Sequence, residues 1–215
     1  MPSNPNSLLG RVFPTCRRLV LEYDVKRFGP IDGKMLVVGS GHNPYRLWSE
    51  QVTVTTLDIE SNNGEVDIVA DAHKMPIDDG QFETVLAVEV IEHLYSPSQF
   101  ISEVSRILKP KGEFVFTIPF LFPIHGDPND YQRYTASGIK ELLRDYEIAE
   151  LRSQGNRIHV ISDLITTVKI GRFPIFIFAR VLNHFLKFVK SNSDSKSPTG
   201  YYVRAVKKGN RDKQT

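Results

Sequence analysis

The fold of this chain is decided by residues 36–43, LVVGSGHN, where an apolar run ends in a Gly-x-Gly turn. About twenty residues later a second apolar run ends in an acid, at TLD of residues 56–58. This pairing is typical of the corner where an α/β domain binds a nucleotide, because glycines let the backbone approach a ligand and a carboxylate can bind ribose hydroxyls. A Gly-x-Gly turn alone is weak evidence, so other residues must decide the ligand.

Length and composition indicate one domain with some additional segments. Hydrophobic residues make up 40% of the chain, and the formal net charge of +2 gives no reason to expect a nucleic-acid partner. The single cysteine, Cys16, excludes an internal disulfide and suits a reducing compartment. The polar N-terminal residues and the lack of a run of about 18 charge-free apolar residues predict a cytoplasmic protein without a transmembrane helix.

Apolar runs alternate with helix-like stretches, which predicts an α/β fold with a doubly wound, mainly parallel sheet. A helix is predicted from Cys16 to Phe28, another from Pro97 to Leu108, and a third from Thr135 as its N-cap. The run from Lys109 to Gly112 is expected to end the second of these helices. Strands are predicted at residues 35–38, 52–57, 66–69, 84–88, 113–118, 148–151 and 201–206.

Four pieces of sequence, in this order, resemble the class I S-adenosylmethionine-dependent methyltransferases of the small-molecule type. They are VVGSGHN at 37–43, TTLDIE at 55–60, DIVADAHKMPIDDGQFETVLAVEVIEHL at 67–94 and SEVSRILKPKGEFVFTIP at 102–119. The third piece is the most specific. The resemblance covers about half of the chain and implies a Rossmann-like sheet of seven strands, with an antiparallel last strand and a helical insertion before it.

The resemblance predicts this organisation: an N-terminal lead and helix at 1–30, a methyltransferase core at 31–155, a helical insertion at 156–195, and the last strand with a basic tail at 196–215. One departure lies in the first loop, where Asn43 stands in place of a third glycine. Asparagine tolerates the left-handed region, so the turn can survive. NAD is a weaker alternative ligand, because its fingerprint needs a glycine where this chain has Pro44.

The resemblance also implies residues that hold S-adenosylmethionine. The glycine turn would pass beside the amino-acid tail, and Asp58 would bind both ribose hydroxyls. Asp71 would meet the adenine amino group, while the Ala72 N–H would meet an adenine ring nitrogen. The alternatives are that the glycines form a purely structural turn, that Asp58 caps a helix and that Asp71 is a surface acid. The expected cofactor residues are Gly39, Ser40, Gly41, Asp58, Ile59, Asp71, Ala72 and Glu89.

Methyl transfer is an in-line displacement, which needs positioning, exclusion of water and, for a hydroxyl acceptor, a base. His93 and His125 are the candidate bases. The loop at 120–135 is dense in polar and aromatic groups, as substrate recognition requires. Alternatively, the charged residues of this loop only hold the loop itself in place. No metal is expected. The predicted substrate contacts are Asp127, Tyr131, Arg133 and Tyr134.

The insertion carries an apolar helical stripe from Ile158 to Val168, followed by a Phe-rich amphipathic segment at 173–190. Five basic residues and one acid lie between Ile158 and Lys190. A packed lid, a homodimer contact and a peripheral membrane contact through 173–190 all fit this pattern. We therefore predict a methyltransferase acting on a small-molecule, sugar or lipid-linked acceptor; the alternative is a non-catalytic methyltransferase-like binding module.

Overall fold

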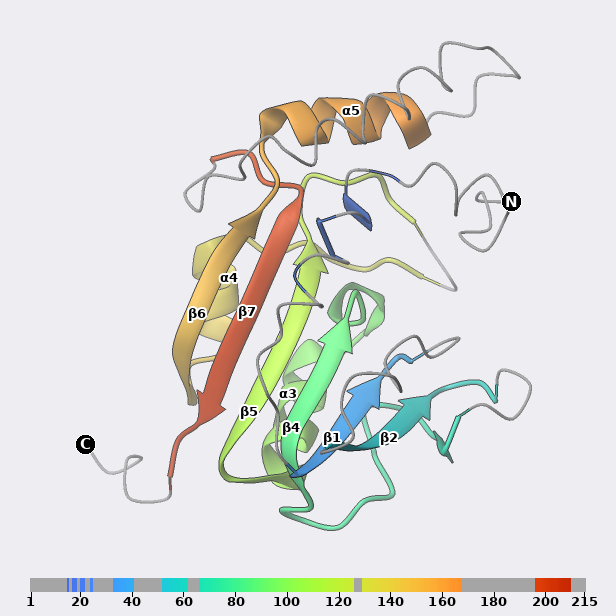
Figure 1. Cartoon of the computed structure of the whole chain (residues 1–215), viewed down its shortest axis with the longest axis vertical. Helices are drawn as coiled ribbons and strands as arrows, with labels where there is room; N and C mark the ends of the chain where they lie inside the picture. Colours follow the sequence, from blue (N-terminus) through green and yellow to red (C-terminus); the bar gives the residue numbers. More distant parts are fainter. Residues whose placement is uncertain are drawn as a thin grey trace. The chain divides into compact units, whose positions relative to one another are not determined.

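The computed structural model of the chain is shown in Figure 1. It divides into two compact units, which we describe separately: unit 1 comprises residues 1–28, 119–130 and 152–202, and unit 2 comprises 29–118, 131–151 and 203–215. The residues that the structure describes are 15, 17–18, 20–21, 24, 33–40, 52–61, 66–125, 129–167 and 196–209.

A seven-stranded sheet has the order β3-β2-β1-β4-β5-β7-β6. The pairs β1–β2, β2–β3, β1–β4 and β4–β5 are parallel, whereas β7 runs antiparallel to its neighbours (Figure 1). This confirms the predicted fold class. The strands are β1 (Gly33–Val38), β2 (Val52–Asp58), β3 (Ile68–Val69), β4 (Phe82–Val88), β5 (Leu108–Pro119), β6 (Tyr146–Gln154) and β7 (Gly200–Lys207).

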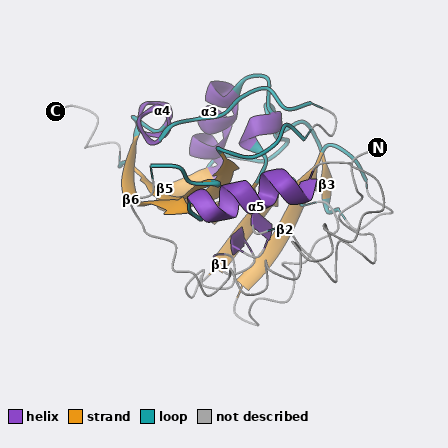
Figure 2. Cartoon of the chain, turned by 90° about the horizontal axis from the view of Figure 1, so that it is seen from above, coloured by secondary structure: helices purple, strands orange, loops and turns teal. Residues whose placement is uncertain are grey.

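The described helices begin where the sequence carries start signals. Pro97 occupies the first turn of α3, and the Thr135 hydroxyl accepts a hydrogen bond from the Gly138 N–H at 3.1 Å, which confirms Thr135 as the N-cap of α4. In unit 2, α3 and α4 lie side by side on one face of the strands (Figure 2). The elements are η2 (Ile91–His93), α3 (Pro97–Ile107), α4 (Ala136–Leu142) and α5 (Arg157–Thr167).

Helix α3 ends at Ile107, just before residues 109–112 that were predicted to end it, and the chain then passes directly into β5. Leu108 pairs with Phe82, and the register between β4 and β5 then shifts before Thr84 pairs with Glu113. Lys111 lies within this shift and has a φ of +62°, a left-handed conformation that lets the strand change its register. Residues 109–112 therefore lie at an irregularity in the pairing of β5 with β4.

The core of unit 2 lies between the central strands and α3. Val85 and Met35, on the paired strands β4 and β1, are fully buried. Phe114 stacks on Phe116 with 4.8 Å between ring centroids and meets Phe100 of α3 edge-on at 5.9 Å. This packing fixes the strands whose ends carry the predicted site.

Two charged residues of α3 hold the segment that follows β3. Arg106 donates to the carbonyls of Met75 and Ile77 and to both carboxylate oxygens of Glu103. Glu103 in turn accepts from the Met75 N–H at 2.8 Å. The hydrogen bond from Arg106 lowers the pKa of Glu103, so the carboxylate stays ionised. These contacts anchor the turn that carries Asp71.

Unit 1 contains a buried polar network that joins its N-terminal part to β6. Asp24 accepts from the Arg152 guanidinium at 2.8 Å and from the Gln154 carboxamide at 2.7 Å. The Arg17 guanidinium donates to Gln154 at 3.3 Å and to Thr199 at 3.4 Å. Residues 17, 18, 20, 21 and 24 are helical, in agreement with the helix predicted there.

Several predictions fall on residues outside the described part. They concern Gly41 and Asn43 of the first loop, Asp127, most of the N-terminal lead and the Phe-rich segment at 173–190. Among the described residues, no helix is long and apolar enough to span a membrane.

Candidate active site

The turn after β1 accepts only glycine at position 39. Gly39 has a φ of +66°, and its N–H donates to the Leu57 carbonyl at 2.8 Å. A Cβ at this position would lie 2.5 Å from Cγ2 of Val90. Within the described residues, the buried Ser40 hydroxyl has no hydrogen-bond partner. The backbone therefore comes close to the residues after β4, and a polar group is left for a ligand.

Asp58 ends β2, where the next residues leave the sheet. Its carbonyl accepts from the Ala70 N–H at 2.9 Å, and its carboxylate accepts from the Glu60 N–H at 3.4 Å. The adjacent Ile59 side chain is 66% exposed. An acid at a strand end beside an exposed apolar side chain suits a ligand with hydroxyls and a flat ring.

Asp71 lies just beyond β3 and is oriented by a residue that the sequence prediction did not include. Its Oδ1 accepts from the His73 backbone N–H at 2.8 Å and pairs with the His73 ring nitrogen Nδ1 at 2.6 Å. The backbone hydrogen bond from His73, with the imidazole contact, lowers the pKa of Asp71. Ala72 between them is buried. A carboxylate therefore remains at this position near neutral pH.

Glu89 follows β4 in a strained conformation. Its φ is +55°, its N–H donates to the Thr117 carbonyl at 3.2 Å, and its carboxylate accepts from the Thr117 hydroxyl at 3.0 Å. A non-glycine residue in this region costs about 1–3 kcal/mol and is typical of ligand sites. This backbone conformation directs the chain out of the sheet and into η2.

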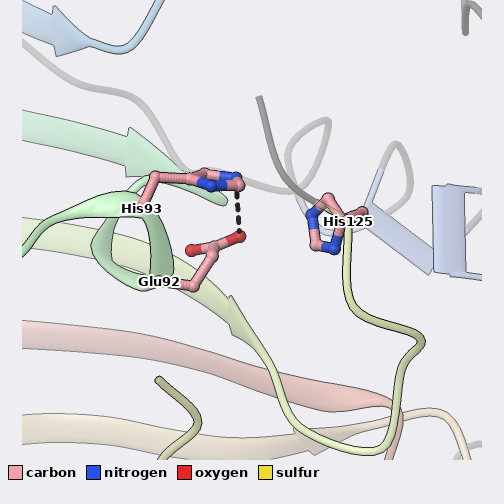
Figure 3. A group of neighbouring side chains, drawn as sticks. All are labelled: Glu92, His93 and His125. Carbon is pink, nitrogen blue, oxygen red and sulfur yellow. Dashed lines mark ion pairs between the residues drawn. The ribbon is translucent and has the colours of Figure 1, made fainter. Parts of the chain in front are cut away.

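Glu92 and His93 form a close pair on η2. The Glu92 side chain is fully buried, and its Oε1 lies 3.7 Å from Nε2 of the 20% exposed His93 (Figure 3). The Tyr131 N–H donates to the Glu92 carbonyl at 2.8 Å. The sequence prediction included His93 but not Glu92, although EVIEHL contains both. Figure 3 also draws His125, which belongs to unit 1.

Gln132 is a second omission, because it ties the 131–135 segment to η2. Its amide donates to the Leu94 carbonyl at 2.7 Å, and its oxygen accepts from the Tyr134 hydroxyl at 3.1 Å. Burial raises the pKa of Tyr134. Arg133 donates to the Gln132 carbonyl at 3.0 Å. Of the predicted substrate contacts in unit 2, Tyr131 is the most accessible, with 53% of its surface exposed.

Comparisons with known proteins find methyltransferases. Residues 36–116 match the family model described as a methyltransferase domain. A protein of Mycolicibacterium smegmatis named as a probable S-adenosylmethionine-dependent methyltransferase is 39% identical over 46 residues. The mitochondrial ubiquinone biosynthesis O-methyltransferase of Dictyostelium discoideum is 51% identical over 41 residues. Residues 36–116 therefore form a domain of the class I S-adenosylmethionine-dependent methyltransferase type.

The sequence alignments are short. They cover 21% and 19% of this chain and span only 18% and 13% of the two relatives. The structural likenesses are longer but show the fold alone. A chain of the Haloferax volcanii complex between the Trm112 methyltransferase activator and a methyltransferase has a TM-score of 0.60 at 16% identity, covering 89% of this chain and 90% of its own.

Two further structures share the methyltransferase fold. Phosphoethanolamine N-methyltransferase 2 of Haemonchus contortus, in complex with S-adenosyl-L-methionine, has a TM-score of 0.57 at 15% identity and matches 96% of this chain and 60% of its own. The [4+2]-cyclase SpnF has a TM-score of 0.59 at 20% identity and matches 89% of this chain and 81% of its own. Because a cyclase shares it, this fold alone does not fix the reaction.

In unit 1, His125 is held by a buried acid. The His125 N–H donates to Oδ2 of Asp130 at 3.0 Å, and the ring nitrogen Nδ1 lies 3.6 Å from the same oxygen. Its ring meets Phe122 edge-on at 5.4 Å. Each of the two predicted bases, His93 and His125, therefore lies beside a buried carboxylate within its own unit.

The residues present fit S-adenosylmethionine. The strands β1, β2, β3 and β4 are neighbours in the sheet of unit 2. At or just after their carboxyl ends lie, in the same order, Gly39, Asp58, Asp71 and Glu89. Since carboxyl ends of parallel strands meet at one edge, the turn and the three acids share that edge. The structure thus brings together four of the positions expected to bind the cofactor.

Proposed function

We propose that this chain transfers a methyl group from S-adenosylmethionine to a small-molecule acceptor. The observation that carries the proposal is the set of strand-end residues in unit 2, where a glycine-only turn precedes acids at the ends of β2, β3 and β4. This set offers a close backbone approach for the amino-acid tail, a carboxylate for the ribose and another for the adenine.

When bound, S-adenosylmethionine supplies a methyl carbon that its sulfonium has already activated. The chain's own residues bind, orient and take up protons. Asp58 and Asp71 hold the nucleoside, and Glu89 lies toward the amino-acid tail. The exposed Tyr131 contacts the acceptor. An acceptor that carries a proton needs a base, and His93 and His125 are the two imidazoles placed beside buried carboxylates.

Calorimetry with S-adenosylhomocysteine tests the proposal. We expect the wild type to bind, and Asp58→Asn to bind about 10- to 100-fold more weakly, because hydrogen bonds to a charged group contribute about 1.5–3 kcal/mol. Asp78→Asn is the matched control, since this exposed acid lies away from the strand ends. No binding by the folded wild type at millimolar ligand would refute the proposal.

A turnover assay then separates an enzyme from a binding module. Binding without methyl transfer to any acceptor in a panel of small molecules, sugars and lipid-linked compounds would favour the module. If transfer occurs, loss of transfer with retained cofactor binding in His93→Asn or His125→Asn identifies the base. Undiminished transfer in both variants would exclude both residues.

We further propose that the protein makes a peripheral contact with an anionic membrane through α5 and the following segment. Ile158 and Ile161 of α5 are 52% and 51% exposed, and Leu164 and Ile165 are each 47% exposed. The single acid of α5, Asp163, is buried and accepts from the Arg17 N–H at 3.0 Å. The sequence from Ile158 to Lys190 carries five basic residues and no acid other than Asp163, which suits lipid phosphates.

Sedimentation with phosphatidylserine-containing vesicles tests this contact. Ile161→Asp should lower the bound fraction several-fold, because a charge in the apolar face must stay in water. Ile124→Asp is the control, since Ile124 is 86% exposed but lies outside α5. Equal losses in the two variants, or no binding by the wild type, would contradict the proposal. A wild-type dimer that Ile161→Asp dissociates would favour a contact between two copies instead.

A further inference from the structure

His73 is buried and uses both of its ring nitrogens. Its side chain is 4% exposed, Nδ1 lies 2.6 Å from Oδ1 of Asp71, and Nε2 lies 3.3 Å from the Ser96 backbone nitrogen. The Ser96 N–H can only donate, so Nε2 is the acceptor. The neutral ring then carries its proton on Nδ1 and donates it to Asp71. The two contacts together select one tautomer.

Residues just before α3 and in its first turn hold the ring and the backbone of His73. The Tyr95 ring stacks on it with 3.9 Å between ring centroids and an interplanar angle of 28°. The Gln99 carboxamide donates to the His73 carbonyl at 3.0 Å. Turning the ring would break its stacking on Tyr95 and its hydrogen bond with Ser96, while Gln99 holds the His73 backbone in place. A rigid donor is thus presented to Asp71, whose own side chain is 47% exposed.

Asp71 has one oxygen committed and one available. Oδ1 takes both hydrogen bonds from His73, whereas Oδ2 has no hydrogen-bond partner among the described residues. An exposed aspartate without such a clamp samples several rotamers and is fully hydrated. Holding Oδ1 removes that freedom before a ligand binds, so less entropy is lost on binding.

We propose that His73 is a positioning residue that makes the site select a 6-aminopurine. It clamps Oδ1 of Asp71 so that Oδ2 accepts a hydrogen bond from the exocyclic amino group of the methyl donor. This inference rests on the proposed function. A carboxylate accepts from an amino group but repels a carbonyl oxygen at the same place, so the clamp favours adenine over hypoxanthine.

The test compares S-adenosylhomocysteine with S-inosylhomocysteine, in which a carbonyl replaces the amino group. The wild type should bind the adenosyl ligand at least about tenfold more tightly. His73→Gln places its amide near the position of Nε2 and loses the donor to Asp71. Its affinity for the adenosyl ligand should fall about tenfold, whereas its affinity for the inosyl ligand should stay within about twofold of the wild-type value. His73→Asn keeps an N–H near Nδ1 and should retain most of the preference.

A purely structural role for His73 would change both affinities alike, so equal losses in His73→Gln would overturn the inference and leave the proposed function standing. Equal behaviour of His73→Gln and His73→Asn would overturn it as well. His159→Gln is the matched control, because His159 is also buried, with Nδ1 2.9 Å from Asn156, but belongs to unit 1. A wild type that binds neither ligand would refute the proposed function itself.

Discussion

Gly39→Ala is expected to destabilise the protein by about 3 kcal/mol and to abolish cofactor binding. The backbone at residue 39 has a φ of +66°, which costs an alanine about 1–2 kcal/mol. The added Cβ would also lie 2.5 Å from Cγ2 of Val90, and such overpacking costs about 1–3 kcal/mol. Relief of the clash must push apart the turn after β1 and the chain after β4, which are the two sides of the predicted cofactor site.

Gly80→Ala separates the two contributions. Gly80 has nearly the same φ, +63°, but a Cβ there would meet nothing within 4 Å. Its loss in the free energy of unfolding, measured by urea denaturation, should therefore reflect the backbone alone. Val90→Ala removes the clashing Cγ2 and should recover part of the loss in a Gly39→Ala background. If Gly39→Ala is no worse than Gly80→Ala, the close approach to Val90 is not a constraint.

Asp24→Ala should cost about 3 kcal/mol through unit 1. The Asp24 carboxylate is 1% exposed and accepts from both Arg152 and Gln154. Removing it leaves a buried carboxamide and a guanidinium without their acceptor, and breaking a buried pair from one side typically costs about 3–5 kcal/mol. Arg152 is 29% exposed and also lies 5.0 Å from the Tyr202 ring centroid, so the lower end is expected.

Two variants make this measurement specific. Asp24→Asn keeps one oxygen acceptor and should lose about half as much stability as Asp24→Ala. Glu141→Ala removes an acid that is 78% exposed and paired with Arg144 at 3.6 Å, so it should change stability by less than about 1 kcal/mol. If Asp24→Ala unfolds at the same urea concentration as Glu141→Ala, the buried network does not stabilise unit 1.

The sheet edge that carries the predicted cofactor residues could be inferred because these residues follow from local pattern. An apolar run that ends in glycine or an acid marks both a strand and its end, and parallel strands place such ends together. Gly39, Asp58, Asp71 and Glu89 were therefore predicted from spacing and resemblance, and the sheet places them at one edge. Their partners were not predicted, since no local signal connects Glu89 with Thr117.

The sequence by itself determined the α/β class, the strand-end residues and the methyltransferase domain, because periodicity and short motifs are properties of the linear chain. Only the tertiary structure decided which side chains hold those residues in place. His73 meets Ser96 across 23 positions, and Asp24 meets Arg152 across 128. Hydrogen bonds and buried ion pairs depend on distances and angles in space, and separation along the chain does not determine these.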